Sequence, residues 1–379
     1  MRLAFITSSF PPYTSGVGIN AATITSGLAD LGHEIHVFLP EYPEQQVRSH
    51  PLVSPKLYFH FVPSLTNPFK KTHRLFTPSP VYFFKALSEV KPDIIHLQEP
   101  QLHIFSSIKL YSKMQKRPLV CAHHFPPEFI TNQIHPEIVK PLVTWLVMSS
   151  VVSLYNQSQE VITPTHAMES LLRKYGLKTP ISVISNGVDT KRFRPPGKQI
   201  NKRGSILYFG RLDFDKNLDT LIQAAKHISN GYEIWFAGSG KAESYLKNLA
   251  EKLQLNNQIK FLGYVPETEK PKIYQQASIF VMPSTAEAQS IVSLEAAASG
   301  LPLVLANAAA LPELISPTHP NGLLFTPKDP RNLADTINKI LASHQKLTAF
   351  GKNSRLLSLT HETSMIIKSY ESTYLNLLQ

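Results

Sequence analysis

Short apolar runs alternate with helical segments along almost the whole chain, and this alternation most constrains the fold. The strand-like runs of the first half are RLAFITSSF, HVFLP, IIHL and PLVCAH. After a turn-rich stretch the alternation starts again with SILYFG, YEIWFAG, IKFLG and ASIFVMP. Strands that alternate with helices predict parallel βαβ units, so we expect an α/β protein.

The length of 379 residues predicts two domains, each large enough to bury a core. Pro195, Pro196 and Gly197 interrupt the alternation, so we place the boundary there, between domains 1–195 and 196–361. We expect two doubly wound, Rossmann-like domains that face a cleft. Ligands of such sheets bind at the carboxyl ends of the strands, where the functional residues are to be sought.

The chain carries a formal net charge of +11, which leans to its first half in stretches such as KLYSKMQKR and PFKKTHRLF. Such stretches attract nucleic acid, phosphorylated substrates or acidic lipid headgroups, or they are simply a solvated surface. The single cysteine, Cys121, excludes an internal disulfide and suits a reducing compartment. The apolar stretch at 141–156 is predicted to be a buried helix, with a membrane-facing surface as the alternative.

The stretch PSTAEAQSIVSLEAAASGLPLV follows a predicted strand and carries two carboxylates, Glu287 and Glu295. We expect a helix that begins close to Ser290 and ends at Gly300, because glycine commonly follows the last helical turn. The free N–H groups and the positive dipole at the start of this helix favour a phosphate. Carboxylates placed beside it can accept hydrogen bonds from sugar hydroxyls.

Other candidate residues follow strands elsewhere in the chain. Arg211 and Lys216 in GRLDFDKN come directly after SILYF and could clamp a diphosphate. His123 and His124 end the run PLVCAHH, where strand ends face the predicted cleft. Gly16 lies in the first strand-to-helix loop, which lacks the G-x-G-x-x-G pattern of nicotinamide-cofactor enzymes.

Taken together, P-S-x-x-E-x7-E-A-x-A-x-G-x-P, the preceding G-R-L-x-x-x-K-N and the earlier I-S-N-G-V-D resemble the retaining glycosyltransferases of family four, which have the GT-B fold. The order and spacing of the motifs match over most of the chain. The resemblance implies a hexosyltransferase that uses a nucleoside-diphosphate sugar, a UDP- or GDP-sugar. It also implies that the last helix, within 362–379, packs back onto the first domain.

The resemblance assigns roles to individual residues. It implies that Arg211 and Lys216 neutralise the diphosphate, Glu295 binds the ribose and Glu287 contacts the donor sugar. His124 would lie near donor sugar and acceptor, with His123 as the second choice. The remaining residues expected at the nucleotide sugar are Gly16, Ala288, Gln289, Ser290 and Ile291.

The reaction implied is front-face substitution, in which the leaving diphosphate accepts the proton of the acceptor hydroxyl. We expect no obligatory metal, since Asp213 and Asp215 lie inside the diphosphate loop and the histidines show no zinc pattern. Gly238-Ser239-Gly240-Lys241 lacks the full spacing of a P-loop.

The acceptor is the most open question. The basic first domain, the apolar stretch and the Glu287-Ala288-Gln289 variant resemble diacylglycerol glucosyltransferases and phosphatidylinositol mannosyltransferases, which favours a membrane lipid or lipid-linked glycan. The protein would then be cytoplasmic or peripheral on the inner face of the cell membrane. The alternatives are a soluble sugar or polysaccharide acceptor, a GT-B sugar epimerase, and a basic nucleic-acid-binding protein, although no RNA-binding aromatic motif accompanies the lysines and we expect no nucleic acid partner.

Overall fold

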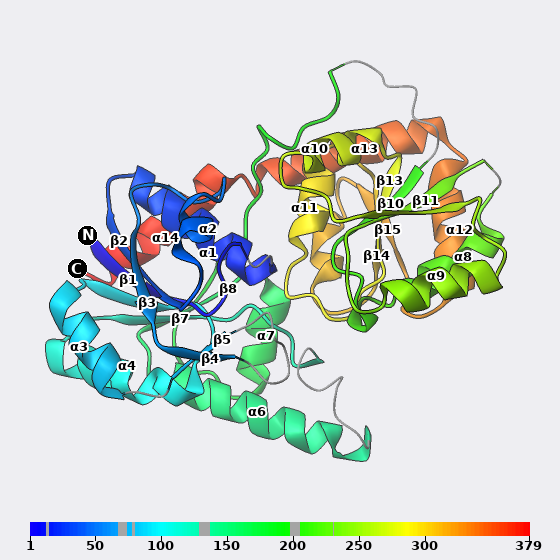
Figure 1. The fold of residues 1–379 in the computed structure, drawn as a ribbon. Helices are drawn as coiled ribbons and strands as arrows, with labels where there is room; N and C mark the ends of the chain where they lie inside the picture. The colour runs from blue at the N-terminus through cyan, green and yellow to red at the C-terminus, as the bar shows by residue number, and fades with distance from the viewer. Residues whose placement is uncertain (13–14, 67–73, 78–79, 129–136, 198–204, 230) are drawn as a thin grey trace. The chain divides into compact units, whose positions relative to one another are not determined.

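The computed structural model of residues 1–379 describes the chain except for residues 13–14, 67–73, 78–79, 129–136, 198–204 and 230. The chain divides into two compact units (Figure 1). Unit 1 contains Met1–His124, Gln133–Asn186 and Ser364–Gln379, and unit 2 contains Phe125–Asn132 and Gly187–Thr363. The chain passes from unit 1 into the long segment of unit 2 after Asn186, which lies before Pro195 in the sequence. The domain boundary at 195/196 remains a prediction.

Unit 1 is built on a seven-stranded sheet in which every pairing is parallel. Its strands are β1 (Arg2–Ile6), β2 (Glu34–Pro40), β3 (Tyr58–Val62), β6 (Ile94–Leu97), β7 (Leu119–Ala122), β8 (Glu160–Thr163) and β9 (Ile181–Val183). Their spatial order is β3-β2-β1-β6-β7-β8-β9. A small antiparallel pair, β4 (Ser64–Thr66) and β5 (Arg74–Phe76), lies outside this sheet.

Helices cover both faces of the sheet of unit 1. They are α1 (Gly16–Asp30), α2 (Glu44–Arg48), α3 (Pro80–Val90), α4 (Leu102–Gln115), α6 (Lys140–Tyr155), α7 (His166–Lys174) and α14 (Thr363–Asn376). Figure 1 shows α1 and α14 on one face and α3 and α4 on the other. Helix α14, at the end of the chain, buries Ile366, Tyr370 and Tyr374 in the same core as α1 and β1. Its Glu371 also pairs with His33 at 2.7 Å, so the last helix is an integral part of unit 1.

Helix α6 differs from the buried helix expected for this apolar stretch. Its last two turns bury Met148, Val152 and Tyr155, whereas Leu142 and Trp145 in its first two turns are exposed. The expectation was wrong because only the C-terminal half of the helix packs into unit 1, although apolar residues occur along its whole length. By length and composition alone, Glu137–Tyr155 could cross a membrane, and it is the one such segment in the described chain.

A histidine stands inside the core of unit 1 at His96 in β6. Its ring stacks on Phe5 with centroids 4.4 Å apart, and its two nitrogens lie 2.8 Å from Gln98 and 2.9 Å from Tyr374. Burial lowers the pKa of the His96 imidazole from 6.5 to about 4. The ring is therefore neutral in the folded protein at physiological pH, and it joins β6 to the C-terminal helix.

The stability of the protein should therefore fall in mild acid. The unfolded chain binds a proton at this ring near pH 6.5, and the folded chain only near pH 4. The stability that the neutral ring contributes is present above pH 6.5 and is lost as the pH falls toward 4. Lowering the pH to about 5 should cost about 2 kcal/mol at this site. Urea unfolding at several pH values measures this, and His96→Asn should flatten the dependence; an unchanged slope in that variant would contradict it.

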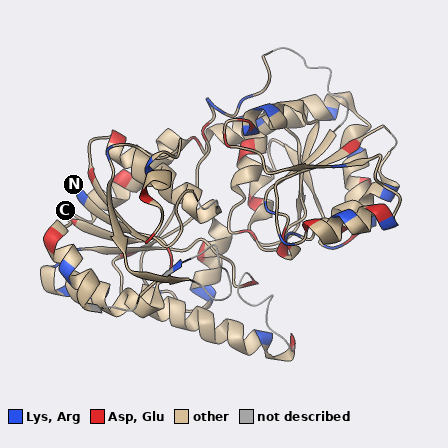
Figure 2. Cartoon of the chain, in the orientation of Figure 1, with Lys and Arg blue, Asp and Glu red and all other residues tan. Residues whose placement is uncertain are grey.

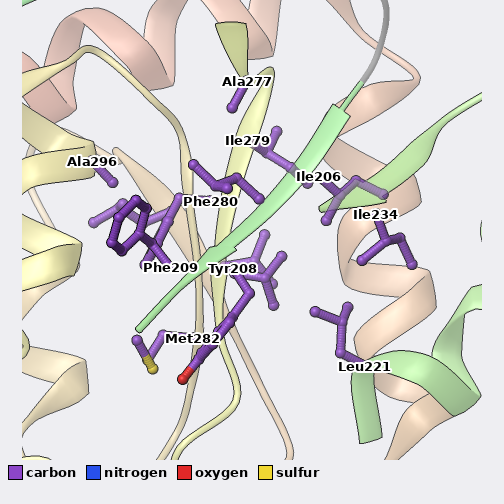
Figure 3. Close-up of a cluster of buried hydrophobic side chains, with 14 of the residues drawn as sticks. Ile206, Tyr208, Phe209, Leu221, Ile234, Ala277, Ile279, Phe280, Met282 and Ala296 are labelled. Carbon is purple, nitrogen blue, oxygen red and sulfur yellow. The ribbon is translucent and has the colours of Figure 1, made fainter. Parts of the chain in front are cut away.

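Unit 2 contains a six-stranded sheet, again with every pairing parallel. Its strands are β10 (Ser205–Phe209), β11 (Glu233–Ala237), β12 (Ile259–Gly263), β13 (Ile279–Met282), β14 (Leu303–Ala306) and β15 (Gly322–Phe325). The helices are α8 (Leu218–Ala224), α9 (Glu243–Lys252), α10 (Lys270–Gln276), α11 (Ile291–Ala298), α12 (Pro330–Leu341) and α13 (His344–Leu359). Figure 3 shows the centre of its core, where Ile206 and Tyr208 of β10 lie close to Ile279 and Phe280 of β13.

The strand order in unit 2 is β12-β11-β10-β13-β14-β15, so the chain runs outward from β10 to β12 and then returns to the other side of β10. The connections that leave β10 and β13 therefore turn to opposite sides of the sheet. Ligands of open parallel sheets bind at such a point, beyond the carboxyl ends of the two strands. The loops after β10 and β13 are the two stretches that carry the predicted diphosphate and sugar residues.

Candidate functional site

The loops after β10 and β13 bring together residues that lie 71 positions apart in the sequence. Lys216 Nζ lies 2.7 Å from Glu287 Oε1 and 3.4 Å from Asp215 Oδ2. Arg211 pairs with Asp213, and its Nη2 lies 3.7 Å from Asp215. Two cations and three carboxylates thus form one cluster at the point where the sheet connections diverge.

The cations of this cluster are held in place by their neighbours. The side chains of Lys216 and Glu287 are 13% and 15% exposed. Burial alone would lower the pKa of Lys216, but the carboxylates of Glu287 and Asp215 outweigh this and raise the pKa above its ordinary value. Lys216 is therefore a fixed positive charge at neutral pH, and an incoming anion would compete with Glu287 for it.

Glycines allow the loop after β11 to pack against the loop of Arg211. Gly238 has φ +133°, and a Cβ on it would lie 2.0 Å from the carbonyl oxygen of Gly210. Leu212 N donates to Ser239 O at 3.0 Å, and Lys241 N donates to Asp213 at 3.1 Å. The Gly-Ser-Gly-Lys stretch, which lacks P-loop spacing, therefore supports the Arg211 loop.

Helix α11 begins directly after the loop of Glu287. Ser290 is its N-cap, and the Ser290 hydroxyl accepts from Ser293 N at 3.3 Å. Ala288, Gln289 and Ser290 are buried, and the helix ends before Gly300, whose φ is +76°. The predicted helix bounds are therefore correct to within a residue or two. The start of this helix follows Glu287 closely in the chain, so its dipole adds positive potential at the end of the Glu287 loop.

Glu295 lies inside α11 with 4% of its surface exposed. Tyr274 OH donates to its Oε2 at 2.8 Å, and Lys270 Nζ lies 3.6 Å from its Oε1. Burial raises the pKa of Glu295, and Lys270 opposes that rise. The glutamate in the apolar helix is thus buried and paired, and its partners differ from those of Glu287.

Neither Lys270 nor Tyr274 was predicted from the sequence. Both lie on α10, which precedes β13, and the four residues from Lys270 to Tyr274 show the helical spacing that puts both on one side. Nothing in the local pattern ETEKPKIY distinguishes this lysine from the exposed Lys272 nearby. Only the position of α10 against α11 reveals that Lys270 faces a buried carboxylate.

The predicted residues of the first half lie in unit 1. Gly16 is the first residue of α1, rather than part of the loop before it, and Ser15 caps the helix by accepting from Gly18 N at 3.0 Å. His123 is fully buried, with its Nδ1 3.3 Å from Tyr155 OH. Its ring is therefore part of the core packing beneath β7.

His124 is the more accessible of the two histidines by surface area. Burial lowers the pKa of its ring to about 3, with His96 and His123 adding to the effect and Asn186 opposing it. Neither ring nitrogen is hydrogen-bonded to a described residue. The Asn186 side chain nevertheless lies close enough to favour the protonated imidazole. His124 is therefore a neutral imidazole with hydrogen-bonding capacity to spare.

Among the described residues, no group of three or more His, Cys, Asp and Glu side chains could hold a metal ion. The positive charges that could neutralise a diphosphate in unit 2 are Arg211, Lys216 and the start of α11. Part of the basic stretch at 68–76 lies outside the described residues.

Two family models match the chain, one in each half. The family model Glycosyltransferase Family 4 matches residues 14–192, and the model Glycosyl transferases group 1 matches residues 189–357. An uncharacterized glycosyltransferase of Methanocaldococcus jannaschii is 27% identical over 90% of this chain and 89% of its own length. The alpha-monoglucosyldiacylglycerol synthase of Streptococcus pneumoniae is 26% identical over 83% of this chain and 73% of its own.

The solved structures give the same result for the fold. The crystal structure of Anabaena HepE in complex with UDP superposes with a TM-score of 0.80 at 20% identity. The match covers 99% of this chain and 100% of that one. A likeness at this identity supports the architecture, two Rossmann-like units with parallel sheets.

Proposed function

We propose a specific reaction for this chain, which belongs to the glycosyltransferases, has the GT-B fold and joins a Family 4 domain to a group 1 domain. The chain is an enzyme with a nucleotide sugar as its donor. The reaction we propose is transfer of a hexose from a UDP- or GDP-sugar to the hydroxyl of a membrane lipid or lipid-linked glycan, with retention of the anomeric configuration.

The cluster of Lys216, Arg211 and the start of α11 is the observation that carries the proposal. A diphosphate bound here would displace the Glu287 carboxylate from Lys216. It would then interact with Lys216, with Arg211 and with the N–H groups at the start of α11. Glu287, once released, would be free to accept hydrogen bonds from the donor sugar. Glu295 would accept the ribose hydroxyls with the lone pairs that Tyr274 leaves unused.

The chemical step we propose needs little from the protein beyond charge and position. The bond from the anomeric carbon to the diphosphate oxygen breaks as the acceptor hydroxyl attacks the same face, and the diphosphate takes the hydroxyl proton. The cations stabilise the charge that develops on the leaving group. We assign His124 to hydrogen bonding with the sugar, because its neutral ring has nitrogens to spare whereas that of His123 contacts Tyr155.

Two observations support a lipid acceptor. The Streptococcus pneumoniae relative is named for the synthesis of a monoglucosyldiacylglycerol, a glycolipid. Helix α6 exposes Leu142, Trp145 and Leu146, and Figure 2 shows the helix almost free of charge after its first turn. An apolar helix face beside a basic first half suits the surface of an anionic membrane. We therefore place the enzyme in the cytoplasm or on the inner face of the cell membrane.

A donor and acceptor panel tests the function. UDP-, GDP- and ADP-sugars are incubated with the full chain, with and without anionic liposomes that contain diacylglycerol and phosphatidylinositol, and products are identified by mass. We expect glycolipid to form from one donor and only with liposomes. Slow donor hydrolysis that ignores lipid would keep the donor site and redirect the search to soluble sugars or polysaccharides. Salt-sensitive DNA binding without turnover of any donor would contradict the proposal.

A further inference from the structure

The buried carboxylate of Glu295 is the end of a chain of charges that the proposed reaction does not yet explain. Lys270 Nζ lies 3.6 Å from Glu295 Oε1 and 2.6 Å from Glu267 Oε1. Arg192 Nη2 lies 2.9 Å from Glu267 Oε2. Four alternating charges therefore connect the segment by which the chain enters unit 2 with the middle of α11.

Lys270, the lysine in this series of charges, is itself largely buried. Its side chain is 12% exposed, and its Nζ stands 5.4 Å from the ring centre of Phe209 at the end of β10. Burying an ammonium group is costly unless carboxylates compensate for the lost water, and two do so here.

The two carboxylate oxygens of Glu295 have different partners. Oε2 accepts from Tyr274 OH at 2.8 Å, so one oxygen is fixed to α10. Lys270 stands at ion-pair distance from Oε1 but beyond hydrogen-bond distance, so it supplies charge without occupying that oxygen. A carboxylate oxygen that accepts no hydrogen bond from a described residue can accept one from a ribose hydroxyl.

We propose that Lys270 is a positioning residue for the ribose of the nucleotide sugar. It keeps the Glu295 carboxylate ionised and oriented toward the ribose, and Glu267 and Arg192 in turn hold Lys270 in place. The inference rests on the proposed function, since it assigns the ligand of Glu295 as a vicinal diol. It adds a residue outside the sequence motifs, on a helix from which no described residue is ion-paired with the cluster at Lys216.

Calorimetric titration of the full chain with UDP, GDP and ADP first identifies the nucleotide that binds most tightly. That nucleotide is then compared with its 2′,3′-dideoxy form. We expect wild type to bind the ribose form about tenfold or more tightly, the usual penalty for leaving a buried polar group unpaired. In Lys270→Met the preference for the ribose form should shrink to about threefold or less, because Glu295 loses both its charge and its fixed orientation.

Two further variants separate position from general stability. Lys270→Arg keeps the positive charge and should keep the preference for ribose. Lys272→Met, on the exposed side of the same helix, is the matched control and should behave as wild type. If Lys270→Met does not fold, Lys270→Gln removes the charge with a polar side chain of similar reach and must give the same loss.

The pH dependence of nucleotide affinity is a further measurement, and it should not change if Lys270 is only structural. Lys270, Glu267, Arg192 and Tyr274 are the charged and titratable groups around Glu295. Without Lys270 the pKa of Glu295 should rise further, so that nucleotide affinity falls at a higher pH than in wild type. An unshifted profile together with an intact ribose preference in Lys270→Met would overturn the inference.

The failure of this inference can be told from failure of the proposed function. Glu295→Ala should weaken binding of the ribose form and leave the dideoxy form nearly unchanged. If Glu295→Ala binds every nucleotide as wild type does, the donor site itself is wrong. If Glu295→Ala loses the ribose preference while both uncharged Lys270 variants keep it, only the role of Lys270 is wrong.

Discussion

Replacing Lys216 by methionine should lower kcat/KM for sugar transfer by about a thousandfold, because it removes a fixed cation from the charge that develops on the leaving diphosphate. The ammonium group is nearly enclosed and is held 2.7 Å from Glu287 and 3.4 Å from Asp215, so neither water nor another side chain is ready to replace it. Steady-state kinetics with the donor chosen by the panel measure the effect.

Loss of activity must be separated from loss of structure, since Lys216→Met leaves Glu287 without its partner. Breaking a buried pair typically costs about 3–5 kcal/mol, whereas replacing both partners can be nearly neutral. The double variant Lys216→Met with Glu287→Gln should therefore recover thermal stability without recovering turnover. Recovery of both together would mean that Lys216 acts only by supporting the fold.

The matched control is Lys226→Met, which removes an exposed lysine from the short 3-10 helix Ala225–His227 directly after α8. It changes the net charge equally, so it reports any loss due to weaker long-range attraction of the anionic donor. We expect wild-type turnover at ordinary ionic strength. If Lys216→Met also keeps wild-type kcat/KM, the diphosphate assignment is wrong, and with it the mechanism.

Much of unit 2 could be predicted because its local signals agree with one another. The run SILYF forms β10, the stretch after Pro283 forms a loop and a helix, and Gly300 ends that helix with positive φ. Each signal needs only nearby residues, such as a capping serine or a glycine after the last turn. The approach of Lys216 to Glu287 is then explained by parallel strands that end at one edge of the sheet.

The contacts that needed tertiary information could not be predicted. The charge of Lys270 is as typical of a solvated helix as that of Lys272, and only the packing of α10 against α11 distinguishes them. The burial of α6 was overestimated for a related reason. Its apolar residues are spread around the helix and along its length, so periodicity gives no indication of which half is covered by the rest of unit 1.

Removing the apolar side chains of α6 should abolish the binding of the protein to anionic liposomes while leaving its fold intact. Leu142, Trp145 and Leu146 are 60%, 56% and 49% exposed, and their spacing puts them on one side of the helix. Exposed side chains contribute little to stability, so the triple change to serine should alter the free energy of unfolding by no more than about 0.5 kcal/mol per site.

The effect on membrane binding should be much larger. Transfer of three large apolar side chains from water into the acyl boundary is worth about 1.5 kcal/mol or more each, so their loss should weaken binding by about a thousandfold. Sedimentation with liposomes of increasing anionic content measures the partition, and the same samples report glycolipid formation. Because the donor cluster is built entirely within unit 2, donor hydrolysis should be unaffected.

A matched control removes exposed leucines elsewhere. Leu356→Ser with Leu359→Ser changes α13, where these side chains are 47% and 42% exposed, and should leave liposome binding unchanged. If the α6 variant still pellets with liposomes, this face does not bind the membrane and the basic stretches become the candidates. If it no longer pellets yet still glycosylates lipid dispersed in detergent at the wild-type rate, α6 delivers the enzyme to its acceptor without taking part in acceptor recognition.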